Sequence, residues 1–110
     1  MQKSYPGLKI RKMRHSDIPK IVSIISRDLG ALDGKKAKRD MTEQQQKLYV
    51  DGQVFVAEDK SGLLGVIGYW HMPYHPKKVC WMDWFGVEKN HKRMGIGSAL
   101  LSHMLNFLAK

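Results

Sequence analysis

Residues 79–87, VCWMDWFGV, constrain the fold more than any other part of the chain. The segment is almost wholly apolar and aromatic, which is typical of a strand that is covered on both faces. A basic turn with two glycines follows, and a segment with a broad apolar helical face comes directly after that turn. A buried strand, a tight turn and a buried helix must therefore follow one another in the fold.

The beginning of the chain predicts one strand and one amphipathic helix. Residues 8–13, LKIRKM, alternate between apolar and basic side chains, as a half-exposed strand does. The helix that follows has these apolar residues on one face: Ile18, Ile21, Val22, Ile25 and Leu29. Ser16 and Asp17 are suited to cap the start of this helix, and Gly30 is suited to end it.

The middle of the chain predicts a second helix and a hairpin. Residues 34–52 are polar and favour a more exposed helix between two turns, anchored by Met41 and Leu48. Residues 54–57 and 63–70 flank the turn sequence DKSG and predict two paired strands. The predicted order is β-α-α-β-β-β-α, that of a single α/β (α+β) domain over all 110 residues, of which 43% are apolar.

The formal net charge is +9, and most of the excess lies in residues 1–50, which hold twelve basic and five acidic side chains. Such a surface attracts nucleic acid, acidic proteins or a phosphorylated cofactor, although a solvated basic face explains it equally well.

Cys80 is the only cysteine, which excludes a disulfide within the chain and predicts a cytoplasmic location. His71 and His75 form no helical ligand pair because Pro73 separates them, so we expect no metal site. No apolar run is long enough to span a membrane, and we expect no membrane partner.

The turn sequence HKRMGIGSAL, residues 91–100, predicts a seat for phosphate groups. The first backbone N–H groups of a helix have no partner within it, and the helix dipole adds positive potential there. Gly95 and Gly97 would let an anion approach the main chain, and Lys92 adds charge. A basic turn without a ligand is the structural alternative. The sequence is neither a dinucleotide fingerprint, since Leu100 stands at the third glycine position, nor a P-loop, since no lysine follows the last glycine.

In its context, this turn resembles the cofactor signature of the GNAT N-acetyltransferase superfamily. The signature Arg/Gln-x-x-Gly-x-Gly/Ala after a strand ending in valine corresponds to Val87 followed by KRMGIG at residues 92–97. The segments LKIRKMRHSDIPKIVSII and EDKSGLLGVIGYW resemble the family's first strand and helix and its second and third strands, in the same order. The resemblance implies the N-terminal portion of the acyl-CoA N-acyltransferase fold, with a mixed, mainly antiparallel four-stranded sheet flanked by helices.

The resemblance also implies acetyl-CoA as the cosubstrate, without a metal. The pantetheine arm would pair with the end of the strand at Phe85, Gly86 and Val87. The pyrophosphate would lie on consecutive residues: Arg93, Met94, Gly95, Ile96, Gly97 and Ser98. Lys92 stands where the family usually has Arg or Gln, and Lys92 or the adjacent Arg93 would supply the charge.

Asp83 is the only acidic residue of the apolar segment and is the candidate catalytic base. Burial among aromatic side chains raises the pKa of a carboxyl group and makes it a better base near neutral pH. The GNAT resemblance points to the same residue, because the family often has Glu four residues before the strand-ending valine. An Asp that only satisfies buried hydrogen bonds or a basic partner is an equally weighted alternative.

The GNAT fold normally continues with a fifth strand, a helix that carries the general acid, and two further strands. We therefore expect residues 1–110 to be a single, truncated GNAT domain whose strand 79–87 leaves an exposed sheet edge. Three explanations stay open: a fragment of a longer enzyme, pairing of this edge with another chain or a second copy, and a reduced member that binds coenzyme A poorly.

We expect an N-acetyltransferase that transfers the acetyl group of acetyl-CoA to a primary amine of an unidentified acceptor. The alternative is a non-catalytic basic binding module, or an inactive CoA-binding fragment, that contacts nucleic acid or an acidic protein. No helix-turn-helix, zinc-finger or aromatic RNA-binding signature in the sequence supports nucleic acid as the partner.

Overall fold

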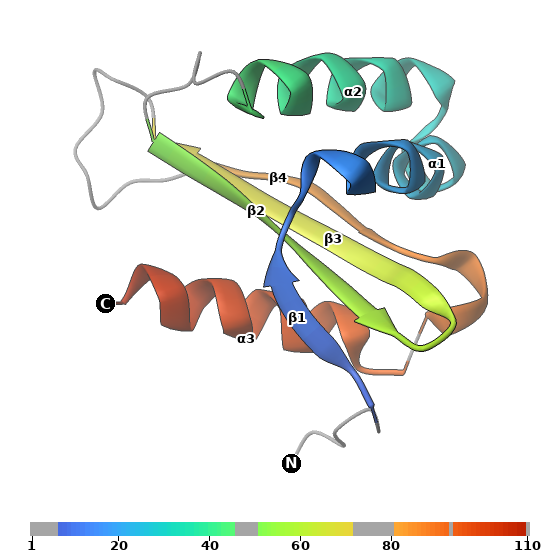
Figure 1. Cartoon of the computed structure of the whole chain (residues 1–110), viewed down its shortest axis with the longest axis vertical. Coiled ribbons are helices and arrows are strands. Elements are labelled where there is room, and N and C mark those ends of the chain that lie inside the picture. Colours follow the sequence, from blue (N-terminus) through green and yellow to red (C-terminus); the bar gives the residue numbers. More distant parts are fainter. Residues whose placement is uncertain (1–6, 46–50, 72–80, 93, 110) are drawn as a thin grey trace.

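The protein forms a four-stranded sheet with helices on both faces (Figure 1). The computed structural model describes residues 7–45, 51–71, 81–92 and 94–109. The elements follow one another in this order: β1 (Lys9–Lys12), the 3₁₀ helix η1 (His15–Asp17), α1 (Ile18–Leu29), α2 (Ala31–Gln45), β2 (Asp51–Asp59), β3 (Gly62–His71), β4 (Trp81–Val87), the 3₁₀ helix η2 (Lys89–His91) and α3 (Ile96–Leu108). The predicted fold class and order of elements are confirmed.

The strands lie in the order β1-β2-β3-β4, and each of their three pairings is antiparallel. The predicted hairpin is the β2–β3 pair. In its turn, the carboxylate of Asp59 accepts a hydrogen bond of 2.8 Å from the backbone N–H of Ser61. Gly62 then has a φ of 125°, which a residue with a side chain rarely adopts.

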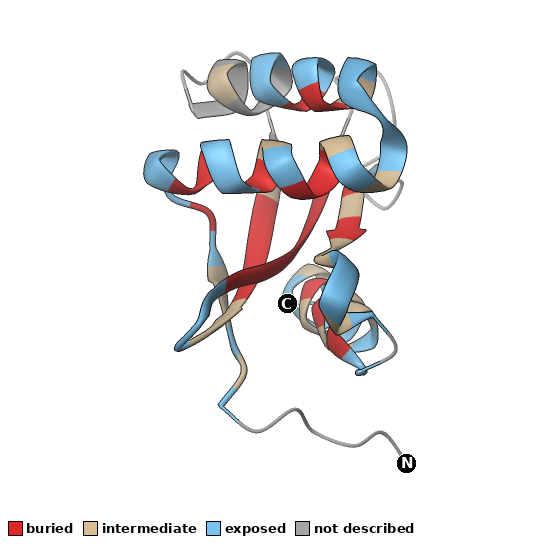
Figure 2. Ribbon diagram, turned by 90° about the vertical axis from the view of Figure 1, so that its right-hand side faces the viewer, coloured by how far each residue is buried: buried red, intermediate tan, exposed pale blue. Residues whose placement is uncertain are grey.

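Two apolar clusters, one on each face of the sheet, form the core. Helix α1 covers one face and α3 covers the other, while α2 packs on the outer side of α1 (Figures 1 and 2). The cluster under α1 includes Ile18, Ile21, Ile24, Ile25, Val54, Val56, Val66 and Trp84. The cluster under α3 includes Phe55, Ala57, Leu64, Ile67, Ile96, Leu100 and Met104. Successive residues of β2 thus belong to different clusters, as side-chain alternation along a strand requires.

The buried faces of the helices differ from the predicted ones at a few positions. Ile24 lies outside the predicted apolar face but is buried, because both the sheet and α2 cover α1. Leu29 is 51% exposed because it is the last residue of α1, next to the chain reversal at Gly30. Leu105 of α3 is 53% exposed, so the contact face of α3 is narrower than its apolar face.

The second helix begins earlier than predicted, at Ala31 instead of Gly34. Only Gly30 separates α1 from α2, and Gly34 lies inside α2 against α1. A Cβ atom on Gly34 would lie 1.8 Å from Oγ of Ser26, so the glycine permits a close helix–helix contact. Ala37, one turn later, is fully buried. Small residues therefore anchor α2, while the side chains of the predicted anchors Met41 and Leu48 lie outside the described residues.

Asp17 precedes α1 as predicted, but its carboxylate makes no capping hydrogen bond to that helix. It accepts hydrogen bonds from the backbone N–H of Arg14 at 2.7 Å and from the guanidinium of Arg11 at 2.8 and 3.0 Å. Arg11 also donates to both carboxylate oxygens of Glu58, at 2.8 and 3.1 Å. The hydrogen bonds from Arg11 hold the pKa of Asp17 and that of Glu58 below their ordinary values. This network joins β1, β2 and the start of α1.

The apolar segment 79–87 forms β4, an edge strand that spans Trp81–Val87; residues 79 and 80 lie outside the described part of the chain. Trp84 is buried under α1, whereas Phe85 and Val87 pack against the cluster under α3. The pairing with β3 is irregular here. Val66 pairs with Gly86 but Gly68 pairs with Asp83, so β4 has one extra residue, and Trp84 has a φ of 55°.

Candidate cofactor site

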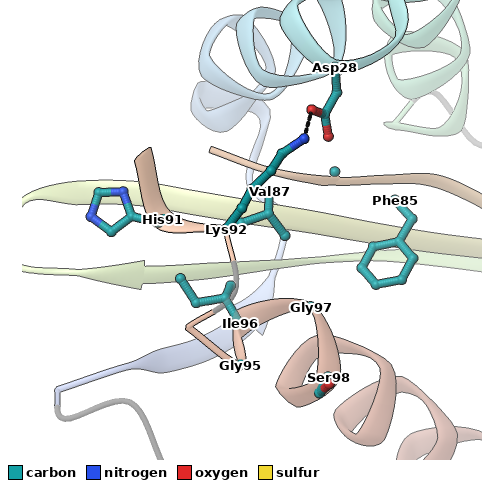
Figure 3. A pocket seen from close by; sticks show the side chains of 10 residues that line it. Asp28, Phe85, Val87, His91, Lys92, Gly95, Ile96, Gly97 and Ser98 are labelled. Atoms are coloured by element: carbon teal, nitrogen blue, oxygen red, sulfur yellow. Dashed lines mark hydrogen bonds and ion pairs between the residues drawn. The ribbon is translucent and has the colours of Figure 1, made fainter. Parts of the chain in front are cut away.

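A pocket of about 330 Å³ lies where β4 ends and α3 begins. Figure 3 shows the residues that line it: Asp28, Phe85, Gly86, Val87, His91, Lys92, Gly95, Ile96, Gly97 and Ser98. All of them except Asp28 belong to the strand–turn–helix segment that the sequence singled out. One continuous segment thus builds most of the pocket, and α1 adds one acidic residue.

Two glycines shape the turn at the floor of this pocket. Gly95 precedes α3 with a φ of 84°, in the left-handed region that disfavours a side chain. Gly97 lies against β4, and a Cβ atom on it would be 3.3 Å from the ring of Phe85. Helix α3 therefore begins close to the end of β4. The unpaired N–H groups and the positive dipole end of α3 lie at the pocket, which favours an anion.

Lys92 lines the pocket, but its ammonium group is bound to the carboxylate of Asp28. Figure 3 shows Lys92 extending towards α1, away from the start of α3. Asp28 was not among the predicted site residues. A signal for it exists in the sequence, because a carboxylate in the last turn of a helix is unfavourable beside the negative end of the dipole. An acidic residue in that position indicates a cationic partner from elsewhere in the chain.

Glu88 fixes the beginning of the turn. Its carboxylate lies 2.7 Å from Nδ1 of His91 and accepts a hydrogen bond of 2.9 Å from the backbone N–H of Asn90. Its own backbone N–H donates to the carbonyl of Leu64 at 2.7 Å. The hydrogen bond with His91 lowers the pKa of Glu88, so this carboxylate is charged at neutral pH. His91, another residue that was not predicted, is thereby held at the pocket.

Most of the predicted cofactor-binding residues meet in this pocket: Phe85, Gly86, Val87, Lys92, Gly95, Ile96, Gly97 and Ser98. Met94 does not line it, and its side chain is 48% exposed. Arg93 lies outside the described residues. The backbone of Asp83 lies in β4 opposite Gly68, but its side chain is also outside the described part, so the candidate base stays a prediction.

Among the described residues, no group of three or more His, Cys, Asp or Glu side chains is placed to hold a metal ion. The side chains of His71, His75 and Cys80 lie outside that part of the chain. Within the same described ranges, no helix combines the length and the apolar character that a membrane crossing requires.

The sequence matches the family model of the acetyltransferase (GNAT) family over residues 18–110. None of the curated proteins matches the chain.

Several solved structures share the fold. One from Desulfovibrio desulfuricans, assigned to the GNAT family, has a TM-score of 0.81 at 14% identity; the match covers 93% of this chain and 66% of that one. An acetyltransferase from Streptococcus agalactiae has a TM-score of 0.74 at 19% identity, covering 94% of this chain and 66% of that one. A GNAT family acetyltransferase from Brucella melitensis, solved in complex with acetyl-CoA, has a TM-score of 0.72 at 21% identity; the match covers 93% of this chain and 68% of that one. The chain thus spans about two thirds of the length of each of these structures.

Proposed function

Because the chain belongs to the acetyltransferase (GNAT) family, we propose that it binds acetyl-CoA and transfers the acetyl group to a primary amine. The observation that carries this proposal is the pocket at the end of β4, where most of the predicted cofactor-binding residues meet. The acetyl-CoA bound to the similar fold from Brucella melitensis supports the same ligand.

On this proposal, the pyrophosphate lies on the turn and the start of α3, at Arg93, Met94, Gly95, Ile96, Gly97 and Ser98. The pantetheine arm follows the end of β4 at Phe85, Gly86 and Val87. Within the described residues, no strand pairs with the outer side of β4. Its outer backbone N–H and C=O groups are therefore open to the amide groups of the pantetheine arm.

In the proposed reaction, the acceptor amine attacks the thioester carbonyl as a neutral nucleophile. The C–N bond forms, the C–S bond breaks, the amine gives up one proton to a base, and coenzyme A leaves as its thiolate. The base then releases this proton, which converts the thiolate into the thiol. We propose Asp83 as that base, acting through a water molecule because its side chain is short. The acceptor is a primary amine that is not yet identified.

The experiment that tests the cofactor site compares two substitutions at one position, Gly95→Asp and Gly95→Asn. Both residues tolerate a positive φ and have similar sizes, so the variants differ mainly in charge. A carboxylate at the phosphate seat should weaken acetyl-CoA binding at least about tenfold relative to the Asn variant. Calorimetry measures the affinities, and circular dichroism checks that both variants are folded. Equal affinities in the two variants would contradict the site.

A non-catalytic basic module that contacts nucleic acid or an acidic protein is the second candidate function. The charge of the first half of the chain favours it, and Lys35, Lys36 and Lys38 are exposed on α2. A thermal-shift panel separates the two candidates. Acetyl-CoA should raise the melting temperature of an acetyltransferase, whereas an oligonucleotide at low salt should raise that of a nucleic-acid-binding module.

We also propose that a strand from a second polypeptide, either another copy of this chain or a different protein, pairs with the first part of β4 around Met82 and leaves Phe85, Gly86 and Val87 to the pantetheine arm. An unpaired edge strand offers a row of open backbone hydrogen-bonding groups, and Met82 on β4 is 51% exposed.

The single cysteine favours the cytoplasm as the location.

A further inference from the structure

A second hollow adjoins the cofactor pocket on the side of α1. It measures about 470 Å³ and is lined by Arg27, Asp28, Lys89 and Lys92. Asp28 and Lys92 line both hollows, so their ion pair marks the border between them. A smaller hollow of about 50 Å³ continues past Arg27 and Lys89 to Lys20. One side of α1 and the segment from η2 to Lys92 thus carry a row of cations next to the cofactor pocket.

The cations of this region outnumber the carboxylates that could neutralise them. The cations are Lys20, Arg27, Lys89 and Lys92, and the carboxylates are Asp28 and Glu88. Both carboxylates are already engaged, Asp28 with Lys92 and Glu88 with the His91 ring and the Asn90 backbone N–H. Among the described residues, Arg27 and Lys89 have no carboxylate partner. The hollow therefore has uncompensated positive charge.

The position of Lys92 separates this hollow from the phosphate seat on the turn. Asp28 holds its ammonium group on the α1 side, whereas α3 begins on the opposite side of the pocket (Figure 3). The backbone N–H groups of the turn can bind one anion without these cations. The cations on the α1 side are therefore available to bind a second anion.

We propose that Arg27, Lys89 and Lys92 form a second anion site, beside the cofactor pocket, that binds a phosphate monoester. The guanidinium of Arg27 offers paired N–H donors, and Arg27 and Lys89 together match the double charge of a phosphate monoester, because the charge of Lys92 is already offset by Asp28. The inference rests on the proposed function, which places coenzyme A in the adjoining pocket. Two molecules could supply the phosphate at this place: coenzyme A, through its ribose 3′-phosphate, or an acceptor amine that carries a phosphate.

The test uses the double variant Arg27→Gln/Lys89→Gln and the control Lys35→Gln/Lys36→Gln, which loses the same charge on α2. Calorimetry at low salt compares coenzyme A with 3′-dephospho-coenzyme A. NMR titrations with O-phosphoethanolamine and with ethanolamine are followed through the backbone amide chemical shifts of residues 27 and 89. They are carried out on the free protein and on the protein saturated with coenzyme A. These four ligands separate the two sources of the phosphate and the effect of the phosphate itself.

If coenzyme A supplies the phosphate, the Arg27→Gln/Lys89→Gln variant should lose about tenfold in affinity for coenzyme A and little for the dephospho form. If the acceptor supplies it, O-phosphoethanolamine binding should fall by the same factor while ethanolamine and both coenzymes are unaffected. An unchanged affinity for every phosphate monoester, or an equal loss in the α2 control, would overturn the proposal. Wild-type protein that binds neither coenzyme contradicts the proposed function instead, and the O-phosphoethanolamine titration of the free protein still tests the anion site.

Discussion

At the residue scale, the proposed chemistry depends on the carboxyl group of Asp83, the one acidic residue of β4. Asp83→Asn should lower kcat about a hundredfold or more, because the amide cannot accept the proton of the amine. The dissociation constant for acetyl-CoA should stay nearly unchanged, since Asn has nearly the same size and shape as Asp. A thiol-release assay with a panel of primary amines measures the rate, and calorimetry measures the affinity.

The matched control for this residue is Asp83→Glu, which keeps a carboxylate and should retain much of the turnover. An Asn variant with wild-type turnover would show that Asp83 is a structural residue and not the base.

Most site residues that are close in sequence were predictable as one site, whereas the pairing of residues that only the fold brings together was not. Gly95, Ile96 and Gly97 follow one another along one turn, so a local pattern was enough to place them in one site. Asp28 reaches the same pocket from α1, and the distance along the chain between Asp28 and Lys92 hides their ion pair from any local pattern.

At the scale of the elements, the contact between α1 and α2 depends on the absence of a side chain at Gly34. Gly34→Val should lower the free energy of unfolding by about 1–3 kcal/mol, because the added atoms would push the two helices apart. Lys36→Val is the control: it places the same β-branched residue at an exposed position of α2 and should cost only about 0.5 kcal/mol. Urea denaturation followed by circular dichroism measures both changes, and equal losses would mean that the close contact contributes nothing.

The ion-pair network of Arg11, Asp17 and Glu58 should make the stability of the fold depend on acid pH. Both carboxyl groups have a folded-state pKa below the unfolded-state value, so the unfolded chain takes up protons first as the pH falls. The stabilisation is fully present above the unfolded-state pKa values, about 4. It is lost as the pH falls through the lower folded-state values.

Urea denaturation of the wild type and of Asp17→Asn over acidic and neutral pH measures this effect. The variant should be less stable at neutral pH and should lose less stability in acid, so the two curves should converge as the pH falls. Parallel curves would exclude a contribution from Asp17. Glu88, whose pKa is also lowered, affects both proteins alike and cancels in the comparison.

At the scale of the whole molecule, the edge of β4, which no other strand of the described residues covers, should govern self-association. We expect sedimentation velocity to show association that rises with protein concentration, together with a rise in acetyltransferase activity per molecule. Met82→Lys places a charge on β4 and should weaken this association, because charged residues protect sheet edges from pairing. Leu32→Lys, at an exposed position of α2, is the control and should leave the association unchanged. A monomer with high activity would refute the need for a second polypeptide.

The overall fold was predictable because each element carries its own periodicity and end signals. The isoleucines of α1, the turn sequence between β2 and β3, and the glycine turn before α3 all appear where the sequence predicts them. The start of α2 was not predictable from its local sequence. Gly34 is a turn residue by propensity, and only the helix packed against it explains why it lies within a helix.

The irregular pairing of β4 has a consequence for how copies of the protein meet one another. A regular edge strand can template the next copy, and a fibre can then grow without limit. The extra residue and the positive φ at Trp84 interrupt the regular spacing of hydrogen-bonding groups along β4. Only a strand with a complementary irregularity can match this edge. We therefore expect association to stop at a closed complex and not to continue into a fibre.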